Sequence, residues 1–215
     1  MAQRSASDPE PLGDPPSDLN ERPLPLVTYS GTAFRIHWLG DDPRRFGRGK
    51  KWRFDDPLGQ YGVMYAAQTP EGAFAETLLP PPGVLTPTAT LIVGSVPVSA
   101  TTIAVHGLAG VTCNTSLQCV DLTGERLASI GADASIATGP WKTSQRWSRA
   151  LFTHPSEPDA LLYRCRRDAS SMALAIHDRG GPKLTVTPLG GLSEPQHTRL
   201  LVQVVQRYHI ALVPG

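Results

Sequence analysis

Glu76 stands where a carboxylate could take part in chemistry. It falls in residues 70–79, where the spacing of Phe74 and Leu78 predicts the inner face of a helix, and Glu76 borders that face. A carboxylate at such an edge is partly desolvated, as a catalytic acid or a charge-stabilising group requires. Most glutamates are exposed to solvent, so a surface glutamate paired with an arginine is the alternative on residue types alone.

The residues before this glutamate predict the elements that position it. Residues 62–67 (GVMYAA) predict a short apolar strand that carries Tyr65. Thr69 can cap a helix and Pro70 suits its first position, so we expect the helix to begin there. Three consecutive prolines, starting at Pro80, end the helix.

A basic and aromatic segment, residues 44–54 (RRFGRGKKWRF), precedes that strand. Six of its eleven residues are basic and three are aromatic. Arginine can bind a diphosphate through two parallel hydrogen bonds, and an aromatic ring can stack on a flat heterocycle. Three interpretations stay open: a phosphate clamp for a dinucleotide, a patch for single-stranded nucleic acid, or a solvated loop neutralised by flanking aspartates. The segment matches neither the P-loop pattern nor the Rossmann glycine pattern.

Cys165 ends a predicted strand beside three arginines, within residues 163–168 (YRCRRD). Nearby positive charge can lower the pKa of a thiol and make it reactive. The alternative is a strand-end thiol packed against the core, which is the commoner role of a cysteine without a neighbouring histidine in the sequence. The histidines show no metal-ligand spacing and the cysteines form no CxxC pair, so we expect no metal site.

The periodicity of the whole chain predicts a mixture of strands and helices. The expected strands are residues 32–36, 62–67, 91–98, 102–105, 159–165, 171–177 and 184–189, and the expected helices are residues 70–79, 124–130, 141–152 and 193–208. Strands dominate the centre of this pattern, which indicates the α+β class.

The domain organisation follows from length and from the composition of the first residues. A chain of 215 residues favours one domain. Residues 1–25 carry six prolines among acidic and small polar residues, a composition that predicts a disordered tail. We therefore expect residues 26–215 to form the folded domain.

Charge and hydropathy exclude several classes of partner. Twenty basic residues balance nineteen acidic ones, so no global charge attracts nucleic acid or an anionic membrane. No apolar stretch is long enough to span a bilayer, and the first residues have no apolar core of a secretory signal. Three cysteines form no disulfide framework, which fits a reducing compartment, and we expect a cytoplasmic location.

Several of these motifs, taken in order, resemble the RES family, which is named for an arginine, a glutamate and a serine. Residues 34–36 (FRI), 52–54 (WRF), 63–67 (VMYAA) and 73–78 (AFAETL) follow the family order, and residues 147–151 (WSRAL) and 159–166 (DALLYRCR) resemble its second half. The resemblance spans roughly residues 30–180, and its most specific part is the strand–turn–helix block that ends in Glu76.

The resemblance implies a fold and a set of site residues. RES proteins resemble ADP-ribosyltransferases, so we expect a single domain with a central split β-sheet flanked by short helices. By resemblance Arg35, Tyr65 and Glu76 are catalytic, while Arg35, Arg53, Tyr65 and Cys165 bind NAD. Cys165 falls where the family has its serine, so this chain departs from the family there, and Ser170 or Ser171 could take that place instead.

The resemblance also implies an activity. RES proteins consume NAD, which here would be the substrate, and the family includes toxins held in check by a small Xre-like antitoxin. The implied function is cleavage of the nicotinamide–ribose bond, with water (a glycohydrolase) or phosphate (a phosphorylase) as acceptor. Alternatives are a mono-ADP-ribosyltransferase acting on a protein, a nucleic-acid-binding module using residues 44–54, and an inactive RES-like interaction protein.

Overall fold

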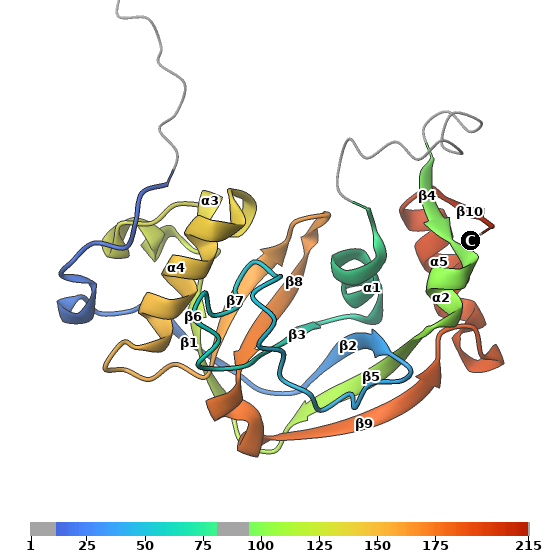
Figure 1. Cartoon of the computed structure of the whole chain (residues 1–215), viewed down its shortest axis with the longest axis horizontal. Helices are drawn as coiled ribbons and strands as arrows, with labels where there is room; N and C mark the ends of the chain where they lie inside the picture. Colours follow the sequence, from blue (N-terminus) through green and yellow to red (C-terminus); the bar gives the residue numbers. More distant parts are fainter. Residues whose placement is uncertain (1–11, 81–94, 215) are drawn as a thin grey trace, which may run out of the picture.

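An eight-stranded sheet forms the centre of the structure, a computed structural model that describes residues 12–80 and 95–214 (Figure 1). In chain order its strands are β1 (Leu26–Tyr29), β2 (Thr32–Trp38), β3 (Val63–Ala67), β5 (His106–Cys113), β6 (Leu117–Asp121), β7 (Ala160–Cys165), β8 (Asp168–His177) and β9 (Leu184–Gly191). Across the sheet their order is β1-β6-β7-β8-β3-β2-β5-β9. Neighbours are antiparallel except β6 and β7, which are parallel. The α+β class is confirmed.

The sheet is split between β2 and β3. These two strands share a single residue pair, Phe34 with Ala67. On either side the pairing is continuous, with seven pairs between β2 and β5 and five between β3 and β8. We call the junction of β2 and β3 the seam. It confirms the split sheet that the family resemblance implied.

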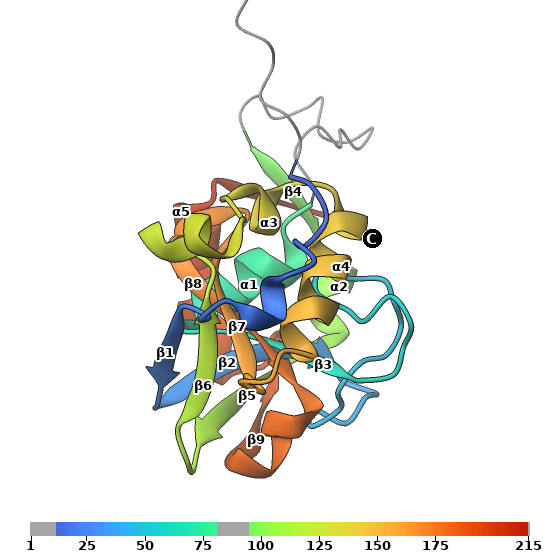
Figure 2. The ribbon, with the colours of Figure 1, turned by 90° about the vertical axis from the view of Figure 1, so that its left-hand side faces the viewer.

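Short helices cover one face of this sheet (Figure 1). They are α1 (Pro70–Leu78), α2 (Ala100–Ala104), α3 (Ser135–Thr138), α4 (Trp141–Phe152) and α5 (Thr198–Arg207). Helix α1 packs on β2, β3 and β8, directly over the seam. Figure 2 shows α1 and α4 on this face from the side, with β9 at the bottom of the view. A second sheet pairs β4 (Val96–Ser99) in parallel with β10 (Ile210–Val213).

The start of α1 confirms the local signals in the sequence. The side chain of Thr69 accepts a hydrogen bond from the backbone N–H of Gly72 at 3.0 Å. Pro70 occupies the first helical position, where its missing N–H costs nothing. Phe74 is fully buried, so the inner face of the helix is the one predicted.

The segment before β1 differs from its prediction. Over residues 12–25 the chain lies on the domain instead of forming a disordered tail, and Leu19 and Leu24 are buried. The indole N–H of Trp147 donates a hydrogen bond to the carbonyl of Gly13 at 2.9 Å. The few apolar residues among the prolines are enough to hold this segment on the domain, because they are buried against the core. Residues 1–11 lie outside the described residues, so the tail predicted there stays a prediction.

Two other elements differ from the sequence pattern. Residues 102–105, predicted as a strand, belong to α2 and its end, because Ser99 caps a helix by accepting from the N–H of Thr102 at 3.4 Å. The last helix begins at Thr198 and not at residue 193, since a 3-10 turn over Pro195–His197 comes first. Of the strand predicted over residues 91–98, residues 91–94 lie outside the described residues, and β4 covers the end of it.

Candidate functional site

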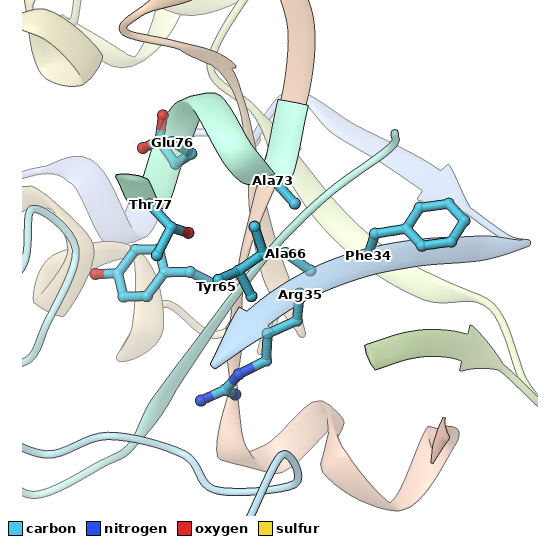
Figure 3. Close-up of a pocket in the computed structure, with 8 residues that line it drawn as sticks. Phe34, Arg35, Tyr65, Ala66, Ala73, Glu76 and Thr77 are labelled. Atoms are coloured by element: carbon cyan, nitrogen blue, oxygen red, sulfur yellow. The ribbon is translucent and has the colours of Figure 1, made fainter. Parts of the chain in front are cut away.

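A pocket lies at the seam, under the C-terminal half of α1 (Figure 3). Three elements line it: Phe34, Arg35 and Ile36 come from β2, Tyr65 and Ala66 from β3, and Ala73, Glu76 and Thr77 from α1. The opening exists because β2 and β3 diverge after their single pair and α1 crosses above them. Three of the predicted site residues therefore border one hollow.

Glu76 has one engaged and one free carboxylate oxygen. Its Oε1 accepts a hydrogen bond from the hydroxyl of Tyr163 at 3.2 Å. Its Oε2 is buried and has no hydrogen-bond partner among the residues that the structure describes. Within that same part of the chain Glu76 forms no ion pair. A buried acceptor without a partner is costly, so Oε2 is available to a ligand hydroxyl.

Tyr65 uses its hydroxyl to hold the loop before β3. The hydroxyl donates to Oδ1 of Asp55 at 3.0 Å and accepts from the N–H of Phe54 at 2.9 Å. Burial, and then the negative charge of Asp55, raise the pKa of Tyr65 well above its usual value, so the phenol stays neutral. Its ring faces the pocket, which leaves it free to flank a ligand (Figure 3).

Arg53 is buried beside these groups, with 7% of its surface exposed. Its Nη1 donates to the carbonyl of Gly139 at 2.6 Å and to the hydroxyl of Ser144 at 3.1 Å. Its Nη2 is buried with no partner among the described residues. Burial and the nearby charge of Arg166 lower the pKa of Arg53, while the charge of Glu76 opposes this shift. Arg53 therefore offers one unused donor close to Glu76.

Arg35 lines the pocket but directs its guanidinium elsewhere. Its Nη1 donates to the carbonyl of Arg45 at 2.8 Å, and burial lowers its pKa to about 10. Side chains alternate along a strand, so Arg35 lies on the sheet face opposite Phe34. Figure 3 shows it extending away from Glu76. The structure thus brings Glu76, Tyr65 and Arg53 together, and it leaves the Arg35 guanidinium apart from them.

Cys165 is not the reactive thiol that neighbouring arginines suggested. It is buried under α1, with its Sγ 3.9 Å from the carbonyl of Gly72. Burial, and then the negative charge of Glu76, raise the pKa of the thiol, so the structure agrees with the other interpretation, a strand-end thiol packed against the core. Two of the adjacent arginines donate to backbone carbonyls instead, Arg164 to Ala169 and Arg167 to Glu76.

The basic segment 44–54 is anchored at its C-terminal end. The aspartate that follows it, Asp55, is buried and accepts from the N–H groups of Lys51 at 2.9 Å and Trp52 at 3.1 Å. Further along, Asp56 pairs with Arg149 at 2.9 Å. These aspartates therefore hold the segment against α4 in addition to neutralising its positive charge.

Sequence reasoning missed several residues of the site. Tyr163, Asp55 and Arg167 each contact a predicted site residue, through the bonds to Glu76 and Tyr65 described above. The alternating pattern of β7 could have placed Tyr163 on the covered face, since it predicts a strand with one buried side. Nothing local in the sequence indicates that this side meets α1.

Comparison with known proteins decides the family. The model of the RES domain family matches residues 32–197, which include the seam and the whole pocket. The chain belongs to the RES domain family. This match confirms the family resemblance, and it covers more of the chain than the motifs that suggested it.

Two known proteins are similar to this RES domain. The chain is 32% identical over 101 residues to the "Probable toxin y4kH" of Sinorhizobium fredii, a match that covers 46% of this chain and 78% of that protein. Among solved structures it is similar to a chain of the M. tuberculosis MbcT-MbcA toxin-antitoxin complex, with a TM-score of 0.54 and 16% identity. That alignment covers 76% of this chain and 86% of the other. At such an identity the likeness shows the fold alone.

The described part of this RES domain holds neither a cluster of metal ligands nor a membrane-spanning helix. Within residues 12–80 and 95–214, no three His, Cys, Asp or Glu side chains are placed together as metal ligands. In the same part of the chain, no helix has the length and apolar character to cross a membrane.

Proposed function

We propose that this RES domain binds NAD and cleaves its nicotinamide–ribose bond, as a toxin restrained by a cognate antitoxin. The observation that carries the proposal is the free, buried Oε2 of Glu76 at the seam pocket. Family membership supports it, as does the relative named a probable toxin. The fold shared with a chain of a toxin–antitoxin complex agrees with it.

Glu76 would act on the charge that develops as the bond breaks. Nicotinamide leaves with the bonding electron pair, so positive charge grows on the ribose as an oxocarbenium-like centre. The carboxylate can accept a hydrogen bond from a ribose hydroxyl through Oε2 and stabilise that charge electrostatically. Tyr163, bound to Oε1, keeps the carboxylate from rotating.

The acceptor then completes the reaction. With water, the ribose carbon gains a hydroxyl and a proton is released, which is the glycohydrolase reaction. With inorganic phosphate, a phosphate oxygen bonds to the same carbon, which is the phosphorylase reaction. With a nucleophilic protein side chain, the domain would be a mono-ADP-ribosyltransferase, and the groups around Glu76 serve all three equally.

The remaining site residues would bind the rest of NAD. Arg53 has a free donor for the diphosphate in its Nη2. Arg35 can join it only by giving up the carbonyl of Arg45. Tyr65 would flank the nicotinamide with its ring. Cys165 would contribute by packing beneath Glu76 in place of the family serine.

The partner and location belong to the same proposal. A protein that destroys NAD must be inhibited in the cell that makes it, so we propose an Xre-like antitoxin as partner. The three free cysteines fit the reducing cytoplasm, where NAD is available. The nucleic-acid alternative has less support, because Arg53 is buried and Arg48 and Arg45 pair with Asp178 and Asp41.

The test is release of nicotinamide from NAD by the purified full chain, measured by chromatography with and without added phosphate. We expect release by the wild type and none by a folded Glu76→Gln variant, since glutamine keeps the shape but loses the charge. Glu71→Gln, on the first turn of the same helix and outside the pocket, is the matched control. Wild-type turnover by Glu76→Gln, or no release by the wild type, would contradict the proposal.

A further inference from the structure

Arginine side chains approach Glu76 from two separate elements. Arg53 comes from the loop before β3, and Arg166 and Arg167 form the turn between β7 and β8. Nη1 of Arg167 donates to the backbone carbonyl of Glu76 at 3.0 Å. The turn is therefore fixed to the helix that carries the carboxylate.

Aromatic packing holds the loop and the strand in one place. The ring of Phe54, which follows Arg53 in the loop, lies edge-on to the ring of Tyr163 with 4.8 Å between centroids. The hydroxyl of Tyr163 in turn binds Glu76 at 3.2 Å. Arg53 and the arginine turn therefore both lie near Glu76, and the charge of Arg166 is close enough to lower the pKa of Arg53.

Two of these arginines have donors that no described protein group accepts. Nη2 of Arg53 and Nε of Arg167 are both buried, and neither has a hydrogen-bond partner among the described residues. Arg53 itself is more than nine-tenths buried. In addition to burial, the charge of Arg166 lowers the pKa of both Arg53 and Arg167, so three guanidinium groups lie near one another beside these free N–H groups. Both features call for an anion with several acceptor oxygens.

We propose that Arg53, Arg166 and Arg167 together bind a phosphoryl group beside Glu76. The inference extends the proposed function and rests on it only for the identity of the larger ligand, NAD. A tetrahedral phosphoryl group offers oxygens to several planar guanidinium groups at once, which a single carboxylate does less well. The group has two possible sources, the diphosphate of NAD and free inorganic phosphate.

Calorimetric titration of the full chain separates these sources without any turnover. The ligands are inorganic phosphate alone, ADP-ribose, and adenosine as the probe without phosphate. Arg166→Gln and Arg167→Gln each remove one charge, and we expect them to weaken phosphoryl binding roughly ten- to a hundredfold. The matched control is Arg164→Gln. The Arg164 side chain donates to the carbonyl of Ala169 and lies on the face of β7 opposite Tyr163, so this variant should leave binding unchanged.

The outcomes distinguish the sources from failure. If inorganic phosphate binds and its binding depends on the arginines, the site is one for free phosphate. If ADP-ribose is the only ligand whose binding depends on the arginines, the site is one for the diphosphate. The inference is overturned if neither ligand binds more tightly than adenosine, or if Arg166→Gln binds like Arg164→Gln. If Arg167→Gln unfolds because α1 loses its contact, the Arg166→Gln variant still tests the inference, because Arg166 is exposed. Absence of nicotinamide release would contradict the proposed function and leave this binding result standing.

Discussion

The hydroxyl group of Tyr163 donates a hydrogen bond to Oε1 of Glu76 across 3.2 Å, although 87 residues separate the two in the chain. Burial, and then the charge of Glu76, raise the pKa of Tyr163 well above its usual value, so the hydroxyl keeps its proton. The strand β7 therefore orients a carboxylate that belongs to α1. A neutral donor of this kind fixes the carboxylate without removing its charge.

Tyr163→Phe should lower kcat for NAD cleavage by roughly five- to a hundredfold and change KM little. The variant keeps the ring against Phe54 but leaves Oε1 without its partner, a loss of about 1–3 kcal/mol. Initial rates of nicotinamide release over a range of NAD concentrations measure both constants. Tyr29→Phe, on the edge strand β1, is the control. An unchanged kcat would show that Tyr163 has no part in orienting Glu76.

Arg53→Ala and Arg35→Ala should weaken NAD binding far more than changes elsewhere in the basic segment. Each removes a held guanidinium from the pocket region, and a lost charge-assisted hydrogen bond to phosphate costs about 1.5–3 kcal/mol, or roughly ten- to more than a hundredfold in affinity. Because Arg35 must first leave the carbonyl of Arg45, its effect should be the smaller of the two. Titrations on a Glu76→Gln background keep the ligand intact.

Arg44→Ala and Arg48→Ala are the controls for that comparison. Arg44 is exposed, and Arg48 forms a surface ion pair with Asp178 at 2.8 Å. Screened surface charges of this kind contribute only a few tenths of a kcal/mol. Equal losses for all four arginines would instead indicate a diffuse basic surface and would favour the nucleic-acid alternative.

Removal of residues 1–24 should lower the melting temperature of the domain. The truncation deletes Leu19 and Leu24 from the core and the carbonyl that Trp147 binds. Leu19→Ala alone should cost about 2–5 kcal/mol, as expected for a buried leucine. Urea unfolding followed by circular dichroism measures both. A chain that begins at Leu12 keeps these contacts and should melt like the full chain, whereas equal stability of the two truncations would show that the segment contributes nothing.

His177 should make the fold less stable in mild acid. Its ring is fully buried against Tyr61 and Phe152, and burial lowers its pKa from 6.5 to about 4. The folded state then binds fewer protons than the unfolded state between these values. The contribution is complete above pH 6.5 and is lost as the pH falls toward 4.

His177→Gln removes that titration and should flatten the pH dependence. Between pH 7 and pH 4 the wild type should lose about 2–3 kcal/mol more free energy of unfolding than the variant. The charged neighbours Asp159, Asp178 and Arg179 are present in both proteins, so the difference isolates the imidazole. Parallel pH profiles for the two proteins would contradict the buried neutral state of His177.

The parts of the fold that follow from sequence are those with local causes. The cap at Thr69, the proline after it and the stripe around Phe74 are all read within one helical turn. The split sheet and the proposed roles of Glu76 and Tyr65 came from family resemblance, since strand order depends on pairs far apart in the chain. Strands β1, β5 and β6 were missed because none of them shows the regular alternation of apolar and polar residues that marks a half-buried strand.

The surroundings of the site could not be predicted for a related reason. Which face of a strand meets a helix is set by register and by sheet order, and a shift of one residue reverses it. That is why Tyr163 and Arg167 were missed, and why family resemblance alone did not show that the Arg35 guanidinium points away from Glu76. Leu19 was missed because average composition over a proline-rich stretch conceals a single residue that is buried in the fold.

The seam has a consequence for how such a site can diversify. Since one residue pair joins β2 and β3, the width of the crevice is set by side chains such as Ala66 and Ala73 and not by a hydrogen-bonded ladder. Substitutions along its rim can enlarge or narrow the opening while both half-sheets keep all their internal pairing. Evolution can therefore change the ligand that fits here without first redesigning the scaffold.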